Sequence, residues 1–367
     1  MLHVGAMKTG TTTLQGVLGR HAEALGAAGV LYPHQPGWIV QVRAVRDALD
    51  LQVPGQRPGR WPALAEQLRT HDGPLAVLSM EFLSFAGPDR ACAVVDSLAP
   101  ADVHAVLTLR DASRVLPSAW QEWTQNRGRT PWAEYLAAAE RLGPGSAAGA
   151  ARPDTPAAKQ CQRVLGTDRM LSAWSGAVAP GHLHVVTVPP QGAPARVLWE
   201  RFASVLGVDP APYELPAERT NESIGYHAAD LMWRVNRAVA DFDFATYEAV
   251  VKQRLCKQVL AQRSERTPVP LPESTRDLAL RWACRTAKLV REVDAHVVGD
   301  LAELDPVPGR FVPGPVPRTD RGAVVAVARD ALAGLGADPV PLGPQARVDA
   351  AVAAVAARVR ELAAERT

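Results

Sequence analysis

The N-terminal segment holds the residues best suited to binding an anion, because positions 4–13 read VGAMKTGTTT. The glycines permit backbone conformations that other residues resist, and threonine suits the start of a helix. The N–H groups of a first helical turn converge on one spot, where the helix dipole favours negative charge. Lys8 adds a full positive charge, and the threonine hydroxyls add hydrogen-bond donors. The segment therefore predicts a strand, a short turn and a helix that together bind a phosphate or sulfate group.

The order of these residues differs from that of the standard phosphate-binding loop, GxxxxGK[ST], because the lysine precedes the second glycine. It resembles the loop of sulfotransferases that use 3′-phosphoadenosine 5′-phosphosulfate (PAPS), which has the form K-[ST]-G-[ST]-[ST]. The longer phrase HVG…KTGTT…LQ resembles the bacterial branch of that family. The alternative is an ordinary strand-to-helix turn with incidental threonines. The resemblance implies a PAPS-dependent sulfotransferase whose 5′-phosphosulfate is bound by Lys8, Thr9, Gly10, Thr11, Thr12 and Thr13.

A second anion site is predicted where another strand ends. The apolar run at 103–109 is followed by Arg110, and Ser118 comes eight residues later in a predicted helix. Ligands of parallel sheets bind at the carboxyl ends of the strands, where an arginine offers a forked donor to a phosphate. A lone arginine at a strand end is often just a surface ion-pair partner. In the sulfotransferases, an arginine and a serine at this spacing bind the 3′-phosphate of PAPS, so the resemblance assigns that phosphate to Arg110 and Ser118.

The chain also departs from the family pattern. Thr13 stands where many cytosolic members have a tryptophan that stacks on adenine, and Asp111 and Ala112 stand where they have Asn-Pro. Their C-terminal RKG-type loop is not found. Trp120 or Trp123 is another possible stacking partner for adenine, although a tryptophan on a helix is more often part of the core. The resemblance covers residues 1–130 and, loosely, 182–207.

Sulfuryl transfer to a hydroxyl or an amine needs positioning, charge stabilisation and usually a base. Lys8 is expected to stabilise the charge that develops on the leaving phosphate. Glu81 follows the predicted strand at 75–78 among apolar residues, and it is the first candidate base, with a cap or an ion pair as its structural alternative. His34, in a loop between two prolines, is the second candidate, against the alternative of a solvent-facing histidine. His3 is interpreted as a core residue.

Two other functions stay open. One is a nucleoside-triphosphate-dependent kinase with an atypical phosphate loop, in which Asp111 would hold Mg²⁺. The other is a non-catalytic relative that binds a nucleotide or a glycan. The nine histidines show no spacing typical of a metal site, such as HExxH, so no metal is predicted. For a sulfotransferase, the expected acceptor is a carbohydrate, a glycolipid or another small molecule.

The composition argues against several classes of protein. The chain has 367 residues, and 47% of them are hydrophobic, which is typical of a globular protein. The 40 basic and 38 acidic residues leave a formal net charge of +2, which argues against a nucleic-acid binder. No apolar run approaches the ~20 residues of a membrane span, and no signal peptide is recognised. The four widely spaced cysteines favour reduced thiols. These features together predict a cytoplasmic protein.

Short apolar runs alternate with helical patterns along the first half of the chain, which indicates a parallel sheet. We therefore predict an α/β fold in three layers, with helices on both faces of the sheet, as in the P-loop-like sulfotransferases. A largely helical C-terminal part follows. The predicted strands are 2–5, 30–32, 75–78, 103–109 and 182–188.

One α/β domain is predicted over residues 1–300, with a helical extension from about residue 221 that includes a helix at 273–298. A Gly/Pro/Ala-rich stretch at 143–159 is interpreted as a loop. Residues 301–320 are predicted to be a Pro-rich linker, and residues 321–367 a C-terminal helical appendage. The apolar faces of its helices must be covered either by the body of the protein or by a partner, for example in a homodimer.

Overall fold

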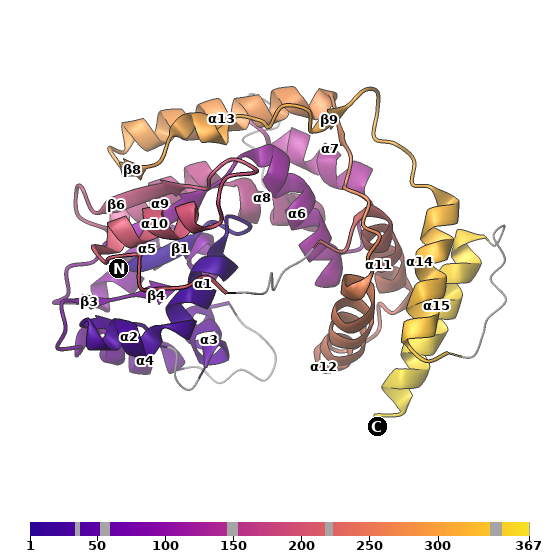
Figure 1. Ribbon diagram of the computed structural model, residues 1–367, viewed down its shortest axis with the longest axis horizontal. Helices are drawn as coiled ribbons and strands as arrows, with labels where there is room; N and C mark the ends of the chain where they lie inside the picture. The colour runs from indigo at the N-terminus through magenta and orange to yellow at the C-terminus, as the bar shows by residue number, and fades with distance from the viewer. Residues whose placement is uncertain (34–36, 52–58, 145–152, 217–222, 338–346, 367) are drawn as a thin grey trace. The chain divides into compact units, whose positions relative to one another are not determined.

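The computed structural model describes the whole chain except residues 34–36, 52–58, 145–152, 217–222, 338–346 and 367 (Figure 1). It divides into two compact units, and neither is one continuous stretch of sequence. The first comprises Met1–Val115, Gln162–Thr220 and Ala279–Val307. The second comprises Leu116–Cys161, Asn221–Leu278 and Pro308–Thr367. Three helices therefore begin in one unit and end in the other, namely α6 (Ala112–Gln125), α8 (Pro156–Leu165) and α13 (Ser274–Glu292).

A five-stranded sheet forms the centre of the first unit. Its strand order is β4-β1-β5-β6-β8, and every neighbouring pair is parallel. The carboxyl ends of these strands therefore lie at one edge of the sheet and the amino ends at the other. The strands are β1 (Leu2–Gly5), β4 (Leu78–Ser79), β5 (Ala105–Leu109), β6 (Leu183–Thr187) and β8 (His296–Val298). A separate pair joins β2 (Val30–Leu31) to β3 (Leu75–Ala76).

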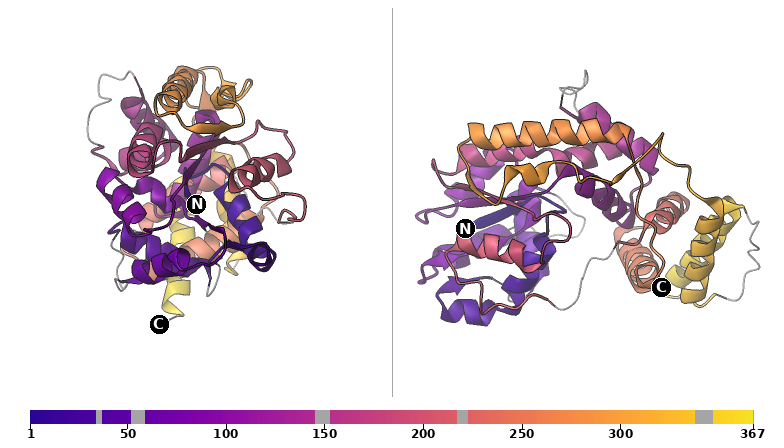
Figure 2. Two further views of the ribbon diagram at one scale, coloured as in Figure 1. Left: turned by 90° about the vertical axis from the view of Figure 1, so that its left-hand side faces the viewer. Right: turned by 45° about the horizontal axis from the view of Figure 1, so that its top comes forward.

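Helices pack on both faces of this sheet (Figure 2). Successive residues of a strand face opposite sides, so Leu107 of β5 belongs to one core cluster and Val106 to another. The prediction of an α/β protein with a parallel sheet flanked by helices is confirmed. The Leu107 cluster includes residues of α3 (Trp38–Ala48), α4 (Arg60–Arg69), α5 (Pro88–Asp96), α9 (Thr167–Ala177) and α13. The Val106 cluster includes residues of α1 (Thr11–Arg20), α2 (Ala22–Ala27) and α10 (Arg196–Leu206).

The structure corrects two predicted elements. The stretch 75–78 is not one strand, because β3 pairs with β2 whereas β4 pairs with β1. The helix predicted at 273–298 ends at Glu292, and its last residues form β8. Asp294 adopts a positive φ of 49°, and the Ala295 N–H donates to the Val290 carbonyl at 3.2 Å, which is the bond of a Schellman-type helix end. The chain then turns into the sheet.

The second unit is mainly helical. Helices α14 (Arg321–Gly334) and α15 (Val348–Ala364) pack on each other and on α11 (Tyr226–Ala238). The unit itself therefore covers apolar residues of both C-terminal helices, such as Val325 and Val355. Its other elements are α7 (Trp132–Leu142), α12 (Phe244–Thr246), the π-helix η2 (Tyr247–Val259), the 3₁₀ turn η3 (Leu260–Gln262) and the pair β7 (Leu271–Pro272) and β9 (Phe311–Val312).

Other expectations concern individual segments. Of the loop predicted at 143–159, residues 145–152 lie outside the described residues, and α8 already begins at Pro156. All four cysteines are unpaired, as the sequence predicts. Over the described residues, no helix combines the length and the apolar character that crossing a membrane requires.

A buried histidine links three strands of the sheet. His3 Nδ1 lies 2.7 Å from the Ser79 hydroxyl, and its Nε2 lies 3.2 Å from the Thr108 hydroxyl. Burial lowers the pKa of His3 from its ordinary value to about 3, because the charged imidazolium is not solvated there. The interpretation of His3 as a core residue is confirmed.

We expect His3 to make the protein less stable in mild acid. The unfolded chain takes up a proton on this imidazole near pH 6.5, whereas the folded chain resists it down to about pH 3, so stability falls as the pH drops through that window. The expected loss between pH 7.5 and pH 5 is about 2 kcal/mol from this group. Urea unfolding at the two pH values should show a smaller loss for His3→Gln. An equal loss in the variant would contradict this assignment.

Candidate functional site

The turn between β1 and α1 lies at the carboxyl edge of the sheet, as the sequence predicts. Three of its residues adopt a positive φ, namely Gly5 at 115°, Lys8 at 64° and Gly10 at 86°. Such a φ is uncommon for a residue with a side chain, so the backbone at Lys8 is held in place by its surroundings. Gly10 is the residue before α1 and provides no side-chain cap for its first turn. A bound anion can take that role.

Thr9 holds this loop to the sheet. Its hydroxyl donates to the Ala6 carbonyl at 2.6 Å and lies 2.5 Å from the hydroxyl of Thr108 on β5. Thr108 in turn donates to the Gly5 carbonyl at 3.1 Å. The Thr9 side chain is thus buried and turned into the protein, so it positions the loop rather than offering a donor to a ligand. A contact between Thr9 and the phosphosulfate, as the sequence predicts, would therefore involve the Thr9 backbone.

The other three predicted loop threonines differ in exposure. Thr11 is buried at the start of α1, Thr13 is half-buried and Thr12 is exposed. Thr12 therefore has the hydroxyl most accessible to a ligand outside the protein.

Arg110 brings the two predicted anion sites together. It follows β5 directly, and its Nη1 donates to the Lys8 carbonyl at 3.3 Å. Both cationic side chains are half-buried. The loop after β1 and the end of β5 therefore place two cationic residues in direct contact at one sheet edge. Ser118 is a half-buried residue of α6 that belongs to the second unit.

Glu81 lies against the same loop from the other side. It begins the 3₁₀ helix η1 (Glu81–Phe85) just after β4. A Cβ on Gly5 would meet the Glu81 carbonyl oxygen at 3.4 Å, so the two backbones are in contact. Gln15 on α1 donates from Nε2 to Glu81 Oε2 at 2.8 Å and to the Ser79 carbonyl at 3.1 Å. The Glu81 carboxylate is therefore held in one orientation beside the loop.

Tyr32 lies close enough to Glu81 for the carboxylate charge to affect its phenol. Burial raises the pKa of its phenol to about 12, a hydrogen bond with Gln41 opposes that shift, and the negative charge of Glu81 adds to it. A neutral phenol therefore lies near Glu81. The second candidate base, His34, lies outside the described residues.

Asp111 has a structural role. Its Oδ1 accepts a hydrogen bond from the backbone N–H of Arg114 at 2.9 Å, as a residue does that caps a helix start, and from the Ser113 hydroxyl. Its Oδ2 pairs with the Arg114 guanidinium, and both side chains are buried. The carboxylate proposed to hold Mg²⁺ in the kinase alternative is thus engaged within the protein through both of its oxygens.

Two tryptophans, Trp120 and Trp123, are the possible adenine-stacking residues in the sequence. Trp120 is fully buried within the second unit, and its Nε1 donates to the Thr130 carbonyl at 3.0 Å. Trp123 packs on the ring of Tyr135, with the centroids 5.6 Å apart. The core interpretation of Trp120 is confirmed.

Sequence reasoning identified Lys8, Arg110 and Glu81 but assigned no role to Gln15 or Tyr32. Gln15 stands within the quoted motif, seven residues after Lys8 and in the second turn of α1, and its side chain reaches β4. That spacing was the available signal. Tyr32 gave none, because its proximity to Glu81 depends on packing between distant segments.

The chain was compared with family models, curated proteins and solved structures. No family model matches the chain, and neither the search of curated proteins nor that of solved structures found a match.

We expect Gly10→Ala to destabilise the protein by about 1–2 kcal/mol, because a side chain at this φ is strained. The new methyl group would also collide with the Leu198 side chain. Gly26→Ala is the matched control, since it lies in α2 with no atom within 4 Å of the added Cβ and should be neutral or stabilising. Urea denaturation measures both. Equal stability of the two variants would contradict the described loop.

Proposed function

We propose that the chain is a PAPS-dependent sulfotransferase and that the carboxyl edge of the first unit binds the nucleotide. The observation that carries this proposal is the 3.3 Å hydrogen bond from Arg110 to the Lys8 carbonyl. It supports a single ligand that carries one anionic group on the loop and a second one beside the guanidinium. PAPS carries its two anionic groups at the 5′ and 3′ positions of one adenosine.

The loop would bind the 5′-phosphosulfate. Backbone N–H groups at the start of α1 and the helix dipole favour the negative charge, and the Lys8 ammonium neutralises it. The Arg110 guanidinium would bind the 3′-phosphate through two parallel N–H donors. Ser118 stays a predicted second ligand of that phosphate.

The transfer itself is an in-line displacement at sulfur. The acceptor hydroxyl oxygen forms a bond to sulfur while the bond from sulfur to the 5′-phosphate oxygen breaks. Lys8 stabilises the charge that develops on the departing phosphate, and Glu81 takes the acceptor proton. The products are the sulfated acceptor and 3′,5′-adenosine bisphosphate. The expected acceptor is a carbohydrate, a glycolipid or another small molecule.

Gln15 would act as a positioning residue. Its amide donates to Glu81 and to the Ser79 carbonyl, so it fixes the carboxylate relative to β4.

Nucleotide binding gives one test of the proposed function. We expect 3′,5′-adenosine bisphosphate to raise the melting temperature in the presence of a chelator, and ATP with Mg²⁺ not to raise it. Lys8→Ala should lose this response while keeping its own unfolding transition, whereas Lys288→Ala, on the surface of α13, should keep the response. Differential scanning fluorimetry measures each case. Stabilisation by ATP with Mg²⁺ alone would favour the kinase and overturn the proposal.

The role of Glu81 as the base gives another test of the proposed function. Glu81→Gln should lower kcat by about 10²–10⁴-fold, since the amide cannot take the acceptor proton, and should leave nucleotide affinity nearly unchanged. Glu66→Gln, at an exposed glutamate of α4 that pairs with Arg69, is the control and should keep full activity. Transfer of ³⁵S from labelled PAPS into extracts of the native host provides the assay. Full activity of Glu81→Gln would assign the proton transfer to another residue.

A further inference from the structure

Four histidines and an aspartate gather at the opposite, amino edge of the sheet, and the proposed transfer uses none of them. We call Asp102, His104, His182, His184 and His296 the amino-edge cluster. Strand register explains the gathering. Ala105 of β5 pairs with Leu183 of β6, so the residues just before them, His104 and His182, are neighbours. His184 lies on the same side of β6 as His182, and it pairs with His296 of β8.

The cluster is closely packed. Asp102 Oδ1 lies 3.1 Å from His182 Nδ1, and Asp102 Oδ2 lies 3.5 Å from His104 Nε2. The rings of His104 and His182 stack with centroids 3.9 Å apart. His182 Nδ1 is a buried atom without a hydrogen-bond partner among the described residues, although the carboxylate is close. Each ring thus presents one nitrogen to the same carboxylate, and because the two rings are nearly parallel, one of them must turn for both nitrogens to point at a single ion.

The two distances to the Asp102 carboxylate are close to those between the ligands of a metal ion. Two ligand atoms of a tetrahedral Zn²⁺, with bonds of ~2.1 Å, lie roughly 3.4 Å apart. One ligand atom from each of Asp102, His104 and His182 lies within 4.8 Å of the other two. Imidazole and carboxylate are ligands that zinc and its neighbours in the first transition row accept. Asp102 is 74% exposed, which leaves room for water as a fourth ligand.

The remaining histidines are placed to orient the ligands. His104 Nδ1 lies 2.9 Å from His184 Nε2, and His184 Nδ1 lies 3.3 Å from His296 Nδ1. Metal-bound histidines usually donate their second N–H to such a partner, which fixes the ring.

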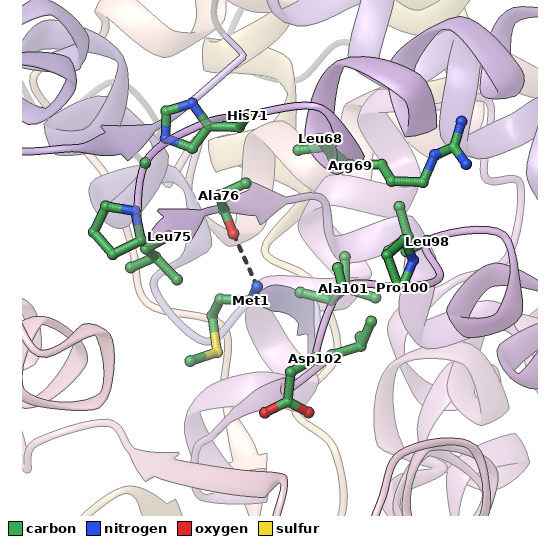
Figure 3. A pocket seen from close by; sticks show the side chains of 14 residues that line it. Met1, Leu68, Arg69, His71, Leu75, Ala76, Leu98, Pro100, Ala101 and Asp102 are labelled. Atoms are coloured by element: carbon green, nitrogen blue, oxygen red, sulfur yellow. Dashed lines mark hydrogen bonds between the residues drawn. The ribbon is translucent and has the colours of Figure 1, made fainter.

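We propose that Asp102, His104 and His182 bind one divalent transition-metal ion such as Zn²⁺, and that His184 orients His104. The ion would join the start of β5 to the start of β6, at the edge of the sheet that does not carry Lys8. Asp102 also borders a cavity of about 310 Å³, where Figure 3 shows its carboxylate turned away from His71. This proposal does not depend on the proposed sulfotransferase activity.

Zinc binding to the full chain, without a polyhistidine tag, tests the site. Equilibrium dialysis of the metal-free protein against Zn²⁺ should give one ion per chain. Asp102→Asn and His182→Gln should each weaken binding by more than about 10-fold. His227→Gln, a histidine of α11 outside the cluster, is the matched control and should bind as the wild type does. Absence of bound zinc, unchanged binding by His182→Gln, or loss in the control would overturn the proposal.

A second measurement uses only the wild-type chain and covers the case in which a variant fails to fold. Zn²⁺ should protect His104 and His182 from acylation by diethyl pyrocarbonate, as read by peptide mass spectrometry, and should leave His227 equally reactive. Equal modification of His104 and His182 with and without zinc would overturn the proposal.

Discussion

The hydroxyl contact between Thr9 and Thr108 holds the candidate site in its shape. It ties the turn after β1 to the neighbouring strand β5, while Thr108 also donates to the Gly5 carbonyl. This contact keeps Lys8 at a positive φ above the sheet edge and within reach of Arg110. Because both side chains are buried, this contact anchors the loop to the sheet from within the protein.

The two sides of this loop carry opposite charge. Lys8 and Arg110 concentrate positive charge where a phosphorylated nucleotide would bind, and Glu81 supplies a carboxylate on the side facing β4. Gln15 orients the Glu81 carboxylate through a hydrogen bond from its side-chain amide. At the opposite edge of the sheet lies the amino-edge cluster, which is the site proposed to bind a metal ion. The parallel strands place the carboxyl-edge loop and this cluster at opposite edges of one sheet.

Local pattern in the sequence predicts part of this arrangement. The glycines and Lys8 indicate the anion-binding turn, and Arg110 follows a readable apolar strand. Other features depend on non-local pairing. The hydrophobic pattern of α13 continues into β8, so the pattern does not show where the helix ends. The stretch 75–78 is divided because its first half pairs with β2 and its second half with β1. The residues of the amino-edge cluster are up to 194 positions apart in the sequence, from Asp102 to His296, and strand register brings them together.

The proposed function requires one nucleotide to span Lys8 and Arg110. This can be measured by isothermal titration of the wild type and of Arg110→Ala with 3′,5′-adenosine bisphosphate and with adenosine 5′-phosphate, which lacks the 3′-phosphate. We expect the wild type to prefer the bisphosphate by about 1.5–3 kcal/mol and the variant to lose this preference. A wild type that binds both nucleotides equally, or a variant that keeps the preference, would contradict it.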